Sequence, residues 1–159
     1  MDERVARLKS PKDCEQFAKN VEARLPELAR DARRRAIELR AAEHNAQSEA
    51  EREALQAVYA YEEVLTAKNR RKTRAARTWQ MIARHGIIEA VERAVDRADD
   101  ASGFTALMNM GMADLAFESV VIRHSGVFRS ETVARATARL DKWRQADLHN
   151  LSQAVIEKK

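Results

Sequence analysis

Apolar side chains recur every three or four residues along nearly the whole chain, and this spacing restricts the fold more than any other feature. Phe17, Val21 and Leu25 are an early example. They follow a Ser-Pro-Lys-Asp sequence in which Ser10 predicts a helix N-cap and Asp13 completes a capping box. The chain has only 4 Gly and 2 Pro, whereas average usage would give roughly 11 and 8. The sequence therefore predicts an all-α fold and excludes a turn-rich β-sandwich or barrel.

Segments with this spacing, separated by cap and turn residues, predict seven to eight helices. They cover approximately 11–25, 26–42, 49–67, 73–85, 87–98, 104–110, 115–124 and 131 onward, with a loop at 99–103. Because Pro26 ends one helix and opens the next, the first two form an αα-hairpin. We expect this N-terminal hairpin, residues 1–45, to pack on a C-terminal helical bundle of residues 46–159. A single domain is the alternative.

The apolar stripe of each predicted helix supplies the candidate core. In the last helix, Arg144 and Asp147 interrupt the stripe, so either the helix breaks near 147–150 or the stripe leaves the core there. The residues predicted to be buried are Phe17, Val21, Leu39, Val58, Leu65, Trp79, Ile82, Val91, Val95, Phe117, Val121 and Leu140. We expect Asp114 to cap the helix at 115–124.

The positive charge of the chain is concentrated in one short stretch, residues 68–86, which we call the basic segment. The whole chain has 29 Lys+Arg and 25 Asp+Glu, for a net charge of +4. The basic segment contains no acidic residue, and its cations are Lys68, Arg70, Arg71, Lys72, Arg74, Arg77 and Arg84. A basic cluster without acids, between nearly neutral flanks, is typical of a site for phosphates or another polyanion.

The arginine spacing in the basic segment indicates how it could bind nucleic acid. If the helix there extends back to Arg70, a rotation of about 100° per residue gathers four side chains into one stripe, namely Arg70, Arg74, Arg77 and Arg84. Trp79 lies on the opposite side and is expected to anchor the core. We therefore expect a nucleic-acid-binding protein without enzymatic activity, and double-stranded DNA is favoured over RNA. The alternative is a helical adaptor or oligomerisation module, such as a homodimer, that binds an acidic protein partner.

Candidate metal ligands do not occur at productive spacings, and we expect no metal and no cofactor. Glu89, Glu92 and Asp96 share a helix face, but Val91 and Val95 mark the opposite face as buried, so the three carboxylates should face water. The histidines have no ligand partners at metal spacing; they are His44, His85, His124 and His149.

The sequence also lacks a catalytic constellation. Cys14, the only cysteine, lies on an apolar stripe and should be a small core residue. A single cysteine excludes an internal disulfide and favours a reducing compartment. No apolar run approaches the length of about 18 residues that a membrane span needs. We therefore expect a cytoplasmic protein without membrane association.

Overall fold

The computed structural model describes residues 1–97 and 101–157, and every regular element in these ranges is helical. This confirms the predicted all-α class. The elements are α1 (Glu3–Ala6), α2 (Pro11–Val21), α3 (Pro26–Ala42), α4 (Glu49–Asn69), α5 (Ala76–His85), α6 (Ile87–Arg97), α7 (Ala101–Asn109), the 3-10 helix η1 (Ala113–Leu115), α8 (Phe117–Arg123) and α9 (Ser130–Glu157). Of the loop predicted at 99–103, positions 99 and 100 lie outside the described residues and 101–103 belong to α7.

Short-range capping explains where two of the helices begin. The Ser10 hydroxyl accepts a hydrogen bond from the Asp13 amide at 3.1 Å, and the Ser48 hydroxyl accepts one from the Glu51 amide at 3.2 Å. Both bonds satisfy amides that have no partner inside the helix. The predicted cap at Asp114 is wrong, because this residue lies in η1 and its carboxylate binds Arg34 instead.

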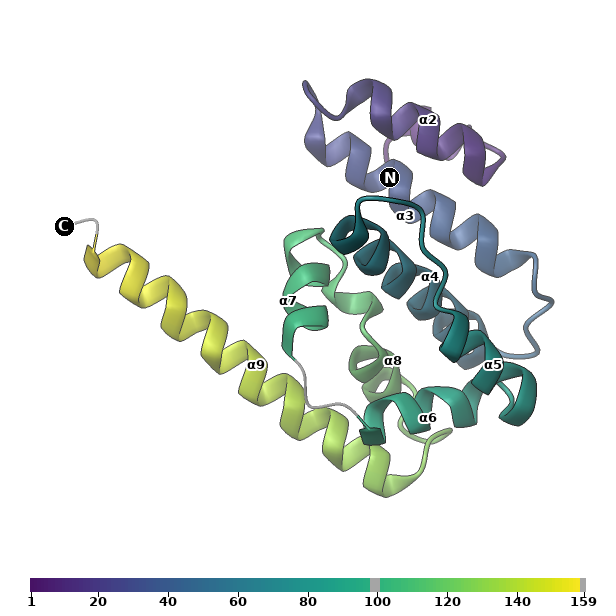
Figure 1. Cartoon of the computed structure of the whole chain (residues 1–159), viewed down its shortest axis with the longest axis vertical. Coiled ribbons are helices and arrows are strands. Elements are labelled where there is room, and N and C mark those ends of the chain that lie inside the picture. Colours follow the sequence, from purple (N-terminus) through teal and green to yellow (C-terminus); the bar gives the residue numbers. More distant parts are fainter. Residues whose placement is uncertain (98–100, 158–159) are drawn as a thin grey trace.

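The long helix α4 occupies the centre of the molecule (Figure 1). It contacts α3, α6, α7, η1 and α8. On one side of it, α2 packs against α3, and α3 packs against α4. On the other side, α5 packs on α6, and α8 packs on α9. The basic segment leaves the C-terminal end of α4 and returns along it to α5, so α4 is the support for the candidate site.

The buried core joins helices from both ends of the chain. Ile37 of α3 and Ala60 of α4 share a cluster with Leu140 and Trp143 of α9. Leu140 is buried, as predicted, and Trp143 stacks on Phe104 with ring centroids 5.3 Å apart. The α3 helix is therefore part of the same packed interior as the C-terminal helix.

The core prediction is partly wrong, and alanine explains the difference. The correctly predicted buried residues are Val58, Val91, Val95, Val121 and Leu140. Those that are only half-buried are Phe17, Val21, Leu39, Leu65, Trp79, Ile82 and Phe117. Much of the interior of α3 and α4 consists instead of alanines, including Ala29, Ala32, Ala36, Ala54, Ala57 and Ala60. Since alanine lets helices approach closely, several larger side chains lie at the edges of the contacts.

The apolar stripe of α9 leaves the core, and the helix does not break. The helix is continuous from Ser130 to Glu157, and it projects from the rest of the molecule (Figure 1). Beyond Trp143 the apolar side chains are open to solvent: Leu148 is 64% exposed, Leu151 57% and Val155 59%. We call residues 144–155 the α9 arm.

Candidate nucleic-acid interface

The basic segment is not one continuous helix. Helix α4 ends at Asn69, and Arg70 adopts a left-handed conformation with φ 57° and ψ 26°. Helix α5 begins only at Ala76. The left-handed residue ends α4 in the manner of a helix C-cap, so the chain changes direction there. The helix does not extend back to Arg70, so the condition for one stripe of Arg70, Arg74, Arg77 and Arg84 is not met.

Side chains of α4 hold the connecting loop at 70–75 in place. The Thr66 hydroxyl accepts a hydrogen bond from the Thr73 amide at 3.0 Å. The Glu62 carboxylate oxygen Oε2 accepts two more, from the Ala75 amide at 2.9 Å and from Trp79 Nε1 at 2.7 Å. The loop and the first turn of α5 thus donate three hydrogen bonds to two side chains of α4.

Trp79 anchors α5 to the body of the protein. Its indole stacks on the His44 ring, with centroids 5.3 Å apart and an interplanar angle of 11°. The Tyr59 ring is tilted against it at 5.2 Å, and the Arg74 guanidinium carbon lies 5.6 Å from its centroid. His44 and Tyr59 are themselves joined by a hydrogen bond of 2.6 Å. These contacts favour the interpretation of Trp79 as an anchor over a role in base stacking.

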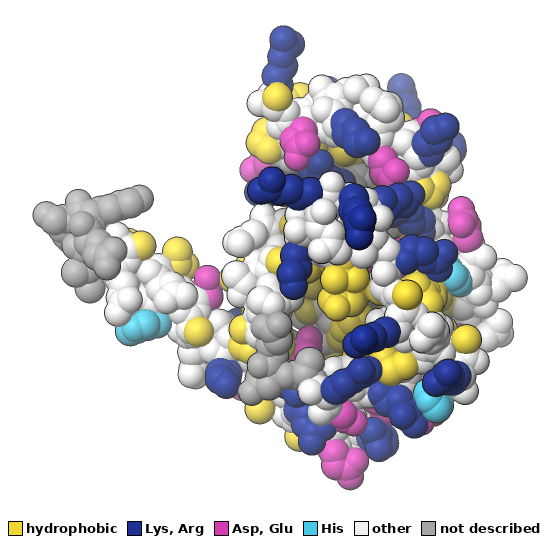
Figure 2. All heavy atoms as spheres, in the orientation of Figure 1, with side chains coloured by type: hydrophobic (Ala, Val, Ile, Leu, Met, Phe, Trp, Pro, Cys, Tyr) yellow, Lys and Arg dark blue, Asp and Glu magenta, His cyan; other side chains and the backbone are white. Residues whose placement is uncertain are grey.

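The cations of the basic segment form no ion pairs with the carboxylates that the structure describes. All of them are exposed, namely Lys68, Arg70, Arg71, Lys72, Arg74, Arg77 and Arg84. Within the described ranges, no carboxylate lies within 4.0 Å of any of them, whereas most arginines elsewhere form ion pairs. Figure 2 shows Lys and Arg side chains spread over the corresponding face of the molecule. The positive charge of these side chains is therefore not held in ion pairs with the described carboxylates.

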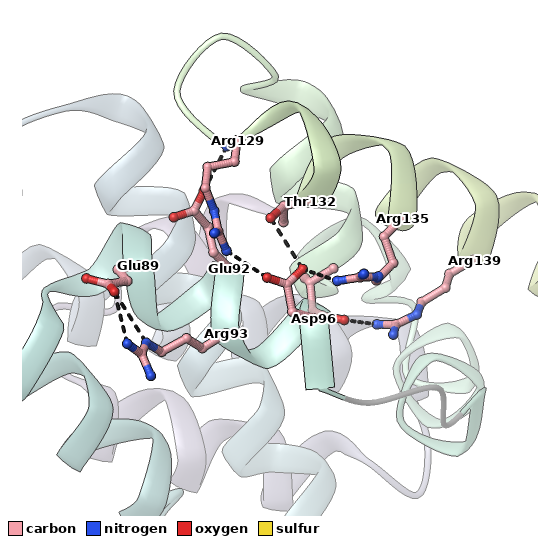
Figure 3. A network of polar contacts seen from close by, with 9 residues as sticks. Glu89, Glu92, Arg93, Asp96, Arg129, Thr132, Arg135 and Arg139 are labelled. Atoms are coloured by element: carbon pink, nitrogen blue, oxygen red, sulfur yellow. Dashed lines mark hydrogen bonds and ion pairs between the residues drawn. The ribbon is translucent and has the colours of Figure 1, made fainter.

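Glu89, Glu92 and Asp96 of α6 were predicted to face solvent, and this prediction is wrong for two of the three. Glu92 is buried, with 7% of its surface exposed, and it accepts a hydrogen bond from the Arg129 amide at 2.7 Å. Asp96 is half-buried and accepts hydrogen bonds from the Arg129 and Arg135 guanidinium groups of the α9 region (Figure 3). Only Glu89 lies on the surface. The start of α9 covers this side of α6, which the periodicity of α6 alone does not indicate.

The described residues offer no candidate metal site, exposed cysteine or membrane-spanning helix. No group of three or more His, Cys, Asp or Glu side chains in the described ranges could hold a metal ion. Cys14 is buried, and burial raises the pKa of its thiol, which disfavours the nucleophilic thiolate. Within the same ranges, no helix combines the length and the apolar character that a bilayer span requires.

Sequence reasoning found the cations but missed the residues that position them. Glu62 and Thr66 lie one helical turn apart on α4 and bind backbone amides of the loop. Such a contact cannot be recognised in the sequence, because nearly every residue type has the backbone amide that donates the hydrogen bond. Gln80, which lies exposed on α5 between Arg77 and Arg84, was missed because it adds no charge.

Comparisons of the chain with protein-family models, with curated proteins and with solved structures find no match. The geometry and the charge of the basic segment are therefore the basis for a functional assignment.

Proposed function

We propose that this protein binds nucleic acid, chiefly double-stranded DNA, through the basic segment and without catalysing a reaction. The observation that carries this proposal is the set of seven exposed cations, none of which forms an ion pair within 4.0 Å among the described residues. Unpaired guanidinium groups are well suited to phosphates, because each can donate two parallel hydrogen bonds to one phosphate group. DNA phosphates would then supply the negative charge that the surrounding protein does not.

The cations fall into two groups with different supports. The first group follows the end of α4 and the loop, and comprises Lys68, Arg70, Arg71, Lys72 and Arg74. The second is Arg77 and Arg84 on α5. Because Glu62 and Thr66 already hold the loop, binding costs less ordering of the backbone than it would for a free loop. We assign phosphate contacts mainly to the first group.

The rest of the chain is proposed to form two helical units. We infer that residues 1–45 form a helical hairpin that packs on the bundle of residues 46–159. Support comes from the packing of α2 on α3 and of α3 on α4. We also propose a cytoplasmic location, which the single cysteine favours because reducing compartments disfavour disulfides.

Salt dependence tests the electrostatic mechanism. If about five of the cations neutralise phosphates, log K for mixed-sequence duplex DNA should fall with log salt at a slope of about −4.5, since each contact contributes about −0.9. Replacing both Arg71 and Lys72 with Ala should flatten the slope by about 2 and weaken binding to all sequences equally. Fluorescence anisotropy at low and moderate salt measures both quantities.

A matched variant separates local from general charge effects. Lys12 and Lys19 are exposed on the outer helix α2, and their joint replacement with Ala removes the same net charge. We expect that variant to keep the wild-type slope. Identical isotherms for the wild type and the Arg71/Lys72 variant would contradict the proposed site.

One observation favours the second candidate, an acidic protein partner. Figure 2 shows hydrophobic side chains in a hollow of the same face, with Lys and Arg side chains around much of it. An acidic amphipathic helix could fill such a hollow and pair with the surrounding cations. This candidate predicts no DNA affinity at low salt, together with binding of an acidic helical peptide that the Arg71/Lys72 variant weakens.

A further inference from the structure

Helix α5 presents to solvent a face with the composition expected of a DNA-reading helix. Its ten residues include no acid. The exposed residues that belong to one sector are Ala76, Arg77, Gln80, Ala83 and Arg84. At about 100° per residue they span about 120°. The two arginines lie at one edge, the two alanines at the other, and Gln80 lies between them.

The opposite face of α5 is fixed to the protein. Thr78 is buried, and Trp79 and Ile82 are half-buried. Glu62 binds the indole of Trp79 at 2.7 Å, and the body of α5 packs on α6. Gly86, with φ 82°, ends the helix directly after His85. The exposed sector is thus held in a defined orientation relative to the body of the protein.

We infer that α5 enters the major groove of DNA and reads base edges through Arg77, Gln80 and Arg84, an inference that rests on the proposed function. The major groove admits an α-helix, and there arginine pairs with guanine, glutamine with adenine, and alanine with the thymine methyl group. The rise from Arg77 to Arg84 is about 10 Å, which matches about three base-pair steps of about 3.4 Å.

The acid nearest in sequence to this face does not oppose the inference. Glu89, on the adjoining helix α6, forms an ion pair with Arg93 at 3.1 Å and lies 4.0 Å from His85 Nδ1. Its charge is therefore compensated within α6 by Arg93. Small side chains at Ala76 and Ala83 leave room for the helix backbone to approach the base pairs.

Selection from a pool of duplexes with a randomised centre tests the inference. The wild type should select a short sequence with guanines about three base pairs apart and an adenine between them. Gln80→Ala should lose the preference at the central position by roughly tenfold or more and should keep the salt slope, since glutamine releases no counterion. Circular dichroism and thermal melting confirm that the variant is folded.

The outcomes distinguish the two proposals. A wild type that binds no duplex at low salt would overturn the proposed function. A wild type that binds duplexes but selects no sequence would leave that function standing and overturn the reading role of α5. An unchanged preference in Gln80→Ala would also overturn it. The Arg71/Lys72 variant should select the wild-type sequence with weaker affinity, which separates phosphate contacts from base contacts.

Discussion

At the scale of single residues, one carboxylate oxygen links α4 to the candidate site. Glu62 Oε2 accepts hydrogen bonds from the Ala75 amide and from Trp79 Nε1. Glu62→Ala leaves both part-buried donors without this acceptor, and we expect a loss of about 1–3 kcal/mol in the free energy of unfolding. Glu62→Gln keeps an oxygen acceptor and should lose less. Urea denaturation measures both variants, and equal midpoints for Glu62→Ala and the wild type would contradict the assignment.

A second carboxylate gives the stability of the protein a defined pH dependence. Burial raises the pKa of Glu118, which lies 3.7 Å from the Arg139 guanidinium. The folded pKa exceeds the unfolded value of about 4.3, so folding favours the protonated Glu118 carboxyl. The stability that this protonation contributes is complete below the unfolded value and is lost as the pH rises through the folded pKa. Lowering the pH from neutral toward about 4.3 should therefore stabilise the wild type relative to Glu118→Gln. A constant difference between their unfolding free energies across this range would contradict the prediction.

At the scale of helices, local chemistry was predictable and long-range polar contacts were not. The caps at Ser10 and Ser48 follow from residues three positions apart. The end of α4 at Arg70 could not be predicted, because no glycine or proline marks it. The hydrogen bonds of Glu62 and Thr66 to the following loop could not be predicted either, because they produce no periodic pattern in the sequence. In the same way, Glu92 and Asp96 looked solvent-facing because their arginine partners lie 33 to 39 residues further along the chain.

The charge pattern revealed the candidate site better than the helix pattern did. The exposure of all seven cations agrees with an acid-free stretch of sequence. Their division between a loop and α5 could not be predicted, since it depends on the left-handed residue at Arg70. The exposed face of α5 was correctly placed opposite Trp79, because the phase of a single helix follows from its own residues.

At the scale of the whole molecule, α3 contributes to the interior that the later helices share. Ile37 is fully buried in the core cluster that also contains Leu140 and Trp143, and His44 stacks on Trp79. We expect a chain of residues 46–159 to unfold at lower denaturant than the full chain. Ile37→Ala in the full chain should lower the free energy of unfolding by about 2–5 kcal/mol. This variant measures the contribution of one core side chain without removing any helix. A truncated chain as stable as the full one would show that residues 1–45 do not stabilise the remaining helices.

The α9 arm also affects how the size of the protein is measured. At about 1.5 Å per residue, residues 144–155 carry the chain roughly 17 Å beyond the packed helices. A projecting rod of this kind adds friction out of proportion to its mass, so a single copy should elute from a sizing column earlier than a sphere of 18.1 kDa. A single extended molecule is therefore expected to elute early, so early elution does not identify a homodimer. Light scattering does identify it, because it measures the mass independently of the shape.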